Sequence, residues 1–342
     1  MLENRNHRSA ALPAGRTTES PAAAGSVAPS TTARTQATWQ TVLAALVVAL
    51  AVWLPRGVEL NRFVTPDESI WLMRSANFYQ ALNVGKLDST FQHGHPGVTV
   101  MYAGLAGYLW KFPAYVDQVD IQYRLGDQFV ERLEELGQSP LNLLTAGRTF
   151  IVLINVIVLT LAFLYARRLI GLWPALIAFL LISFDPFYLG LTRLLHPDSL
   201  LSSMMILATV AFMAYLFAGR RTSDLIAAGV YTALSWLTKT PAIFLIPLVG
   251  LLTLIEFVPH IVQQYGWQWR NFFTRAALWR LFRTWLIWGS AAIVVYVALW
   301  PAMWVAPLET LQNVLDISSS YAIYGHSSTL FFNGKIYNGD PG

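Results

Sequence analysis

The chain has 342 residues, of which 55% are hydrophobic and only 12% are charged, with a formal net charge of +4. Soluble domains carry about 25% charged residues, so this composition predicts a protein embedded in lipid. The absence of cysteine excludes disulfides, thiolate nucleophiles and cysteine-based metal sites. The many tryptophan and tyrosine residues are typical of side chains at a membrane–water boundary.

Residues 1–38 are rich in Ala, Thr, Ser, Pro and Arg and show no apolar periodicity. Such a segment buries too little apolar surface to offset the entropy lost on ordering, so we predict a disordered cytoplasmic tail. Residues 39–342 are then predicted to form one all-α integral membrane domain with about seven transmembrane helices. Residues 306–342 end in a loop with no closing element, which indicates the start of a truncated outer loop in a fragment of a longer protein.

Apolar runs of roughly 17–25 residues can cross a bilayer as a helix. Residues 225–257 could form either one long helix or two short helices broken at Lys239-Thr240-Pro241. Proline disfavours helix in the residue before it and lysine is costly at mid-bilayer, so two helices are favoured. The other predicted spans are residues 39–56, 143–166, 170–190, 199–218 and 285–305.

The placement of charge predicts the orientation of these spans. With the N-terminus inside and two helices in 225–257, the inside segments carry twelve of the 23 Lys and Arg residues but only four of the 19 Asp and Glu residues. This asymmetry matches the positive-inside rule. The outer face then carries a long first loop, residues 57–142, in which residues 67–83 and 97–110 are predicted to form helices at the membrane interface.

Four segments of the predicted outer face place polar residues beside apolar helices. They are Thr65-Pro66-Asp67-Glu68, His93-Gly94-His95-Pro96-Gly97, His196-Pro197-Asp198 and Lys239-Thr240-Pro241. Each segment also has an ordinary structural interpretation. Thr65 and Glu68 can form a capping box at a helix N-terminus, and capping explains Glu68 better than Asp67. The histidines can be satisfied loop residues, Asp198 can begin a helix, and Lys239 can extend to the interface.

All four segments lie on the same predicted side of the membrane, which favours a functional site. Asp67 and Arg74 lie two helical turns apart and therefore share a helix face. Prolines before apolar helices also place helix N-termini, which bind phosphate, at the outer surface. A divalent metal could bind through Asp67, Asp198 or His196, although no spacing demands one, so no cofactor is assigned.

The acidic pair Asp67-Glu68, directly after the first predicted transmembrane helix, resembles that of the C-type membrane glycosyltransferases, which use polyprenyl-phosphate sugars. The pattern is most similar to the protein O-mannosyltransferases of glycosyltransferase family 39 and to the bacterial aminoarabinose transferases, over roughly residues 40–342. Four further matches follow in chain order. His95-Pro96 stands where the aminoarabinose transferases have Lys-Pro, and Arg148 matches an arginine that opens the second helix. Asp198 matches an acid in the second outer loop, and Leu237-Thr238-Lys239 matches a recurrent Leu-Thr-Lys. The chain departs from the aminoarabinose transferases at Ile70 and His95, where those enzymes have arginine and lysine.

The resemblance implies an inverting glycosyltransferase in the plasma (inner) membrane, with a cytoplasmic N-terminus and its active site on the outer face. A departing phosphate needs no general acid, so one general base is enough. The family implies Asp67, with Glu68 beside it, in that role. The candidate ligands of the donor phosphate are Arg74, His95, Arg148 and Lys239. The implied partners are a polyprenyl-phosphate-linked sugar, an acceptor hydroxyl on a protein, lipid or glycan, and membrane lipids, with no nucleic acid.

Two other functions stay open at this point. A transporter or flippase of lipid-linked sugars would be expected to have broken helices and charged groups at mid-membrane. Here the charged residues gather at predicted helix ends on one face, which favours an interfacial enzyme. A non-catalytic membrane scaffold would tolerate Asp67→Asn without loss of function.

Overall fold

The computed structural model describes residues 31–324, 330–332 and 334–337. Its contact pattern divides the chain into residues 1–40 and residues 41–342. The described part of the first unit is the start of helix α1 (Thr31–Gly57), so the last eight residues of the predicted tail 1–38 are helical. Extending an apolar helix that has already formed costs little, which explains why polar residues join it. The rest of the predicted tail lies outside the described residues.

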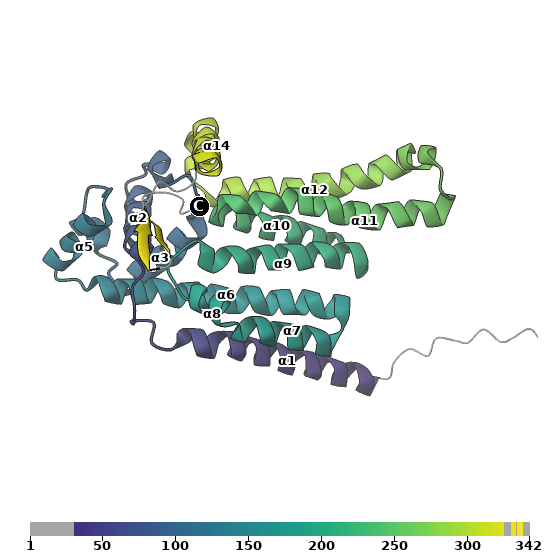
Figure 1. The fold of residues 1–342 in the computed structure, drawn as a ribbon, viewed down its shortest axis with the longest axis horizontal. Helices are drawn as coiled ribbons and strands as arrows, with labels where there is room; N and C mark the ends of the chain where they lie inside the picture. The colour runs from purple at the N-terminus through teal and green to yellow at the C-terminus, as the bar shows by residue number, and fades with distance from the viewer. Residues whose placement is uncertain (1–30, 325–329, 333, 338–342) are drawn as a thin grey trace, which may run out of the picture. The chain divides into compact units, whose positions relative to one another are not determined.

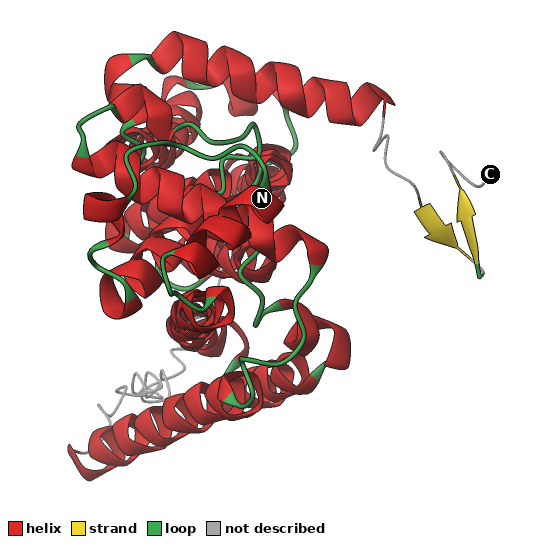
Figure 2. Cartoon of the chain, turned by 90° about the vertical axis from the view of Figure 1, so that its left-hand side faces the viewer, coloured by secondary structure: helices red, strands yellow, loops and turns green. Residues whose placement is uncertain are grey.

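The second unit confirms the prediction of an all-α membrane fold, because its described residues are almost entirely helical (Figure 2). Its described strands, β1 (Leu330–Phe332) and β2 (Lys335–Tyr337), form one short antiparallel pair. Five helical segments are long and apolar enough to cross a membrane by length and composition, so the chain is a multi-pass membrane protein. They are Thr38–Gly57 of α1, α6 (Pro140–Ile170), α9 (Asp198–Phe217), Thr240–Tyr265, which comprises η2 (Thr240–Phe244) and α11 (Leu245–Tyr265), and α12 (Arg275–Leu299).

The remaining two predicted spans are shorter helices. Residues 170–190 were predicted as one span, but the chain forms α7 (Leu172–Phe184) and α8 (Pro186–Leu191) instead. The break arises because the Asp185 side chain accepts a hydrogen bond from the Tyr188 backbone N–H and Pro186 occupies the first helical position. The predicted break at Lys239-Thr240-Pro241 is confirmed, since α10 (Thr222–Thr238) ends directly before it.

The long helices pack in sequence, with α6 against α9, α9 against α10, and α10 against α12 (Figure 1). Glycine permits the closest of these approaches, as is common between helices in membranes. A Cβ atom at Gly229 would lie 2.4 Å from the backbone oxygen of Trp288, so α10 and α12 touch backbone to backbone at this point. A Cβ atom at Gly107 would lie 2.7 Å from the backbone nitrogen of Gly147 and would separate α3 (Val98–Lys111) from α6.

One end of these helices is covered by a layer of shorter helices. It contains α2 (Pro66–Asn83), η1 (Leu87–Thr90), α3, α4 (Tyr115–Gln118), α5 (Gly126–Glu135), α13 (Ala302–Val305) and α14 (Pro307–Tyr324) (Figure 1). α2 and α3 confirm the helices predicted at 67–83 and 97–110. Much of α2 is buried within the protein, in a core that includes Trp71, Phe78 and Tyr108. This layer positions the polar segments singled out in the sequence.

The opposite end of the same helices carries paired arginines. Arg168 forms a salt bridge with Asp224 at 2.6 Å, and Arg220 forms one with Glu256 at 2.8 Å. The two ends of the helices therefore differ in chemistry, as the asymmetry of charge in the sequence requires.

Candidate active site

The four polar segments predicted from the sequence meet at the end of the helices covered by α2 and α3. Gly97 donates its backbone N–H to the Thr238 carbonyl oxygen at 3.1 Å, and the hydroxyl groups of Thr99 and Thr238 lie 2.8 Å apart. These bonds fasten the start of α3 to the end of α10. His95 Nδ1 lies 2.8 Å from the hydroxyl oxygen of Thr240, directly beyond the same helix end. The second and fourth segments thus form one continuous polar surface.

Glu68 and Arg148 form the buried centre of this end. Glu68 has no exposed side-chain surface, Arg148 is 2% exposed, and Arg148 Nε lies 2.7 Å from Glu68 Oε1. Burial alone would raise the pKa of Glu68, but hydrogen bonds from Arg148, Thr65 and Leu195 hold this pKa below its ordinary value. Thr65 donates both its backbone N–H and its hydroxyl to Glu68 Oε2, which confirms the structural interpretation of Glu68 as a capping residue.

Arg148 uses all of its hydrogen-bonding capacity within the protein. Arginine has five N–H donors, and those of Arg148 bind both oxygens of Glu68 and the carbonyl oxygens of Leu60, Arg62 and Phe63. A contact with a donor phosphate, as predicted for Arg148 from the resemblance, would require one of these bonds to break. Arg148 lies on α6, and its contacts hold both α2 and the segment after α1 against this helix.

The same ion pair positions the third polar segment. The backbone N–H of Leu195 donates to Glu68 Oε1 at 2.9 Å, which places the neighbouring residue, His196, beside the first turn of α2. There His196 Nε2 lies 3.4 Å from Asp67 Oδ2. A carboxylate whose partners lie 80 and 127 positions away in the chain therefore determines where the imidazole of His196 sits.

Asp67, His196, Asp198 and Lys239 form an alternating row of acidic and basic groups. His196 Nδ1 lies 3.4 Å from Asp198 Oδ2, and Lys239 Nζ lies 2.7 Å from Asp198 Oδ1. Asp67 is the most accessible member, with 66% of its side chain exposed, whereas His196 is 17% exposed. Burial lowers the pKa of His196 from its ordinary value, although Asp198 opposes this effect. This lowering favours the neutral imidazole, whose Nδ1 accepts a hydrogen bond from the Asp198 backbone N–H at 3.3 Å.

The candidate metal ligands Asp67, Asp198 and His196 do not converge on a common point. The two acids approach opposite nitrogens of the His196 ring, which thus separates them. Within the part of the chain that the structure describes, no group of three or more His, Asp or Glu side chains has the geometry to hold a metal ion.

Arg74, His93 and His196 all contact the Trp71 ring. The Arg74 guanidinium carbon lies 4.6 Å from the centre of the Trp71 ring, a cation–π contact. His93 and His196 both meet the same ring edge to face, with ring centres 6.5 and 6.2 Å away. Arg74 therefore lies on the same side of α2 as Asp67, as the helical spacing predicted.

An apolar groove opens beside this polar surface. Its volume is about 470 Å³, within the range of small-molecule sites. Pro96 and Thr240 both line it, and the polar Thr240 connects it to His95. The other lining residues are Trp236, Ile243, Ile293, Tyr296, Val297, Met303, Leu311, Val314, Leu315 and Ser318. The sequence did not predict this groove, because one of its walls is α14, which was assigned only to an outer loop.

Arg56 also contributes to this region, although no pattern in the sequence predicted a role for it. It is fully buried in the last turn of α1, where Nε donates to the Thr192 hydroxyl at 2.7 Å and Nη1 donates to the Ser183 carbonyl at 3.0 Å. The contact ties α1 to the segment that leads into His196. An arginine in the final turn of an apolar helix was the only local signal of this role.

His93 makes the stability of the folded state depend on pH. Burial, supported by the positive charge of Arg74 and by His95, lowers the pKa of His93 to about 4. The unfolded chain binds a proton near the ordinary histidine pKa of about 6.5, so the folded state loses stability as pH falls from about 6.5 to about 4. We expect His93→Gln to unfold at a temperature that falls less over this interval than that of the parent. Equal pH dependence of the two unfolding temperatures would contradict this assignment.

Comparison with known proteins adds one match. Residues 142–288, somewhat less than half of the chain, match the family described as dolichyl-phosphate-mannose-protein mannosyltransferase. No curated protein and no solved structure matches the chain. The matched region contains Arg148, His196, Asp198 and Lys239, whereas Asp67 precedes it. The match supports a membrane glycosyltransferase in general. The match of residues 142–288 to this family model thus supports the resemblance inferred from the sequence.

Proposed function

We propose that this protein transfers a sugar from a polyprenyl phosphate to an acceptor hydroxyl at the outer face of the membrane. The observation that carries the proposal is the position of the row Asp67–His196–Asp198–Lys239, with Arg74 and His95, beside an apolar groove. A lipid-linked sugar phosphate needs both surfaces at once, one for its charged head and one for its hydrocarbon chain. Protein, lipid and glycan acceptors all offer the required hydroxyl.

Asp67 is the proposed general base. It is the exposed acid of the row, so an acceptor hydroxyl can reach it from solvent. Asp67 accepts the hydroxyl proton as the acceptor oxygen attacks the anomeric carbon. The bond from that carbon to the phosphate oxygen breaks, and its electron pair leaves on the phosphate. Attack opposite the leaving phosphate inverts the anomeric centre. His196, held beside Asp67 by the bond from the Leu195 backbone to Glu68, orients the carboxylate.

Lys239, Arg74 and His95 are the proposed ligands of the donor phosphate. Lys239 is bound to Asp198 at 2.7 Å but keeps further N–H donors, since an ammonium group has three. Preorganised cations of this kind stabilise negative charge as it develops on a leaving group. Glu68 and Arg148 act as positioning residues instead, because the protein itself satisfies both side chains.

The distribution of charge favours an enzyme over a transporter. The buried pair Glu68–Arg148 joins α6 to the covering layer, and Arg168–Asp224 joins the opposite ends of α6 and α10. A transporter would be expected to place such groups at the broken middles of its helices. Here Arg148 lies in the third turn of α6, Arg168 lies in its last turn, and Asp224 lies in the first turn of α10.

The groove is the proposed site of the first isoprene units of the donor. We expect Leu315→Trp, which fills the groove from α14, to raise the KM for a long-chain polyprenyl-phosphate sugar about tenfold. This estimate assumes that two methylene groups lose their contacts, at about 0.8 kcal/mol each. A donor with a single isoprene unit should be affected far less.

The matched control is Leu308→Trp, which adds the same side chain to the same helix. Leu308 is exposed and does not line the groove. Steady-state transfer rates over a range of donor concentrations give both KM values. An equal KM for the parent and Leu315→Trp with the long-chain donor would remove the groove from donor binding.

A further inference from the structure

The turn between α11 and α12 and the first turns of α12 carry a surface of exposed apolar side chains, four of them aromatic. It is made of Trp267, Phe273, Leu278, Trp279 and Phe282, each more than one third exposed. This aromatic turn surface lies at the opposite end of the helices from α2 and α3 (Figure 1). It has no part in the proposed transfer reaction.

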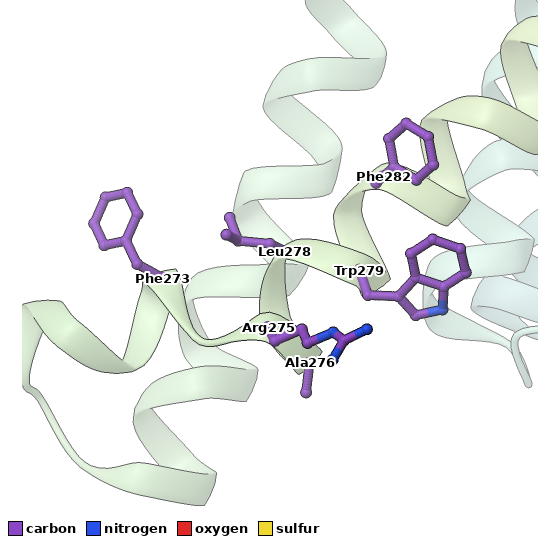
Figure 3. A pocket seen from close by; sticks show the side chains of 6 residues that line it. All are labelled: Phe273, Arg275, Ala276, Leu278, Trp279 and Phe282. Carbon is purple, nitrogen blue, oxygen red and sulfur yellow. The ribbon is translucent and has the colours of Figure 1, made fainter.

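The surface is hollowed rather than flat. A shallow cavity of about 890 Å³ is lined by Phe273, Arg275, Ala276, Leu278, Trp279 and Phe282 (Figure 3). Arg275, Trp279 and Phe282 recur at helical spacing along the first two turns of α12, so they share one face. The cavity thus has a wall of aromatic and aliphatic groups with a guanidinium at its edge.

The chain segment around this cavity is basic. Residues 257–308 contain four arginines and no aspartate or glutamate. Arg280 forms a salt bridge with Glu256, which also binds Arg220. Arg275 and Arg283 are exposed, and neither has a carboxylate partner among the residues that the structure describes. Arg275 lines the cavity, and Arg283 follows Trp279 by one turn of α12, so both arginines are available to an anion from outside the chain.

We propose that the aromatic turn surface binds an anionic phospholipid, with the lipid phosphate on Arg275 and Arg283 and its acyl chains against Leu278, Trp279 and Phe282. A guanidinium group binds phosphate oxygens in a planar, two-pronged arrangement. Tryptophan favours the boundary between headgroups and hydrocarbon, and basic pockets at the cytoplasmic ends of transmembrane helices bind anionic headgroups. A soluble anion would gain nothing from the apolar wall, so a lipid is the occupant that uses the whole surface.

Native mass spectrometry of the detergent-purified protein tests this proposal by titration with phosphatidylglycerol and, separately, with phosphatidylcholine. The parent is expected to bind phosphatidylglycerol more tightly. The double variant Arg275→Gln/Arg283→Gln should lose most of this preference, at about fivefold per arginine. Arg221→Gln removes another exposed arginine from the same end of the helices and should keep the preference.

Three results would overturn the proposal. Equal binding of the two lipids by the parent would remove the preference for anionic headgroups. Retention of the preference in the double variant would place the lipid elsewhere. Displacement of phosphatidylglycerol by millimolar inorganic phosphate would identify a simple anion site that makes no use of the acyl chains.

Discussion

Replacing Arg148 by methionine is expected to cost about 3–5 kcal/mol of folding free energy, because it leaves a buried carboxylate without its cation. Glu68 is fully buried and receives two hydrogen bonds from Arg148. The same substitution leaves the carbonyl oxygens of Leu60, Arg62 and Phe63 without their donor. Each group buried without a partner adds a desolvation cost. Unfolding of the detergent-solubilised protein by denaturant measures the difference in free energy.

The control is Arg132→Met, which removes an exposed arginine from its salt bridge with Glu135. Exposed pairs contribute about 0–1 kcal/mol, so this variant should remain near the stability of the parent. The double variant Glu68→Gln/Arg148→Met removes both buried charges and should recover part of the loss. Similar small losses for Arg148→Met and Arg132→Met would contradict the positioning role and return Arg148 to the candidate phosphate ligands.

Asp67→Asn is expected to lower the rate of sugar transfer at least about a hundredfold, because an amide cannot accept the acceptor proton and a general base contributes typically 10²–10⁴-fold. Asparagine keeps the size of the side chain, and its Oδ1 can still accept a hydrogen bond from His196 Nε2. Because Asp67 is 66% exposed, its replacement should leave stability nearly unchanged. Transfer rates and unfolding temperatures measured on the same preparations separate the two effects.

Asp127→Asn is the matched control for this variant. Asp127 is an exposed acid in the first turn of α5, as Asp67 is in α2, so both substitutions remove the same favourable interaction with a helix N-terminus. Asp127→Asn should transfer sugar at the rate of the parent. Equal rates for the two asparagine variants would reduce Asp67 to a helix-capping acid.

The sequence predicted the parts of the site that have local signals. Thr65-Pro66 marks the start of α2, and Lys239-Thr240-Pro241 marks the break between α10 and α11, because capping groups and proline act on their own neighbours in the chain. The apolar run at 170–190 has the length of a span, but the helix breaks at Asp185-Pro186. The length of this run predicts one span, whereas the capping Asp185 and the following Pro186 are the local signals of the break.

The contacts that build the site could not be predicted in this way. His196 meets Asp67 only because Glu68 binds the Leu195 backbone, a bond across 127 positions with no periodic signal. Arg148 was assigned to phosphate by its position in the family pattern, and only its five contacts within the protein indicate a positioning role. The groove likewise depends on the packing of α14 beside α12 and η2, which is a tertiary property.

The proposed donor is a sugar on a polyprenyl phosphate, and direct measurement of sugar transfer tests this proposal. Membranes holding the full-length protein would be supplied with a panel of polyprenyl-phosphate sugars and, in parallel, with the corresponding nucleotide sugars. We expect transfer from at least one lipid-linked donor, and none from the nucleotide sugars once lipid-linked donors cannot be formed from them. Transfer from a nucleotide sugar under those conditions, or no transfer from any lipid-linked donor, would contradict this proposal.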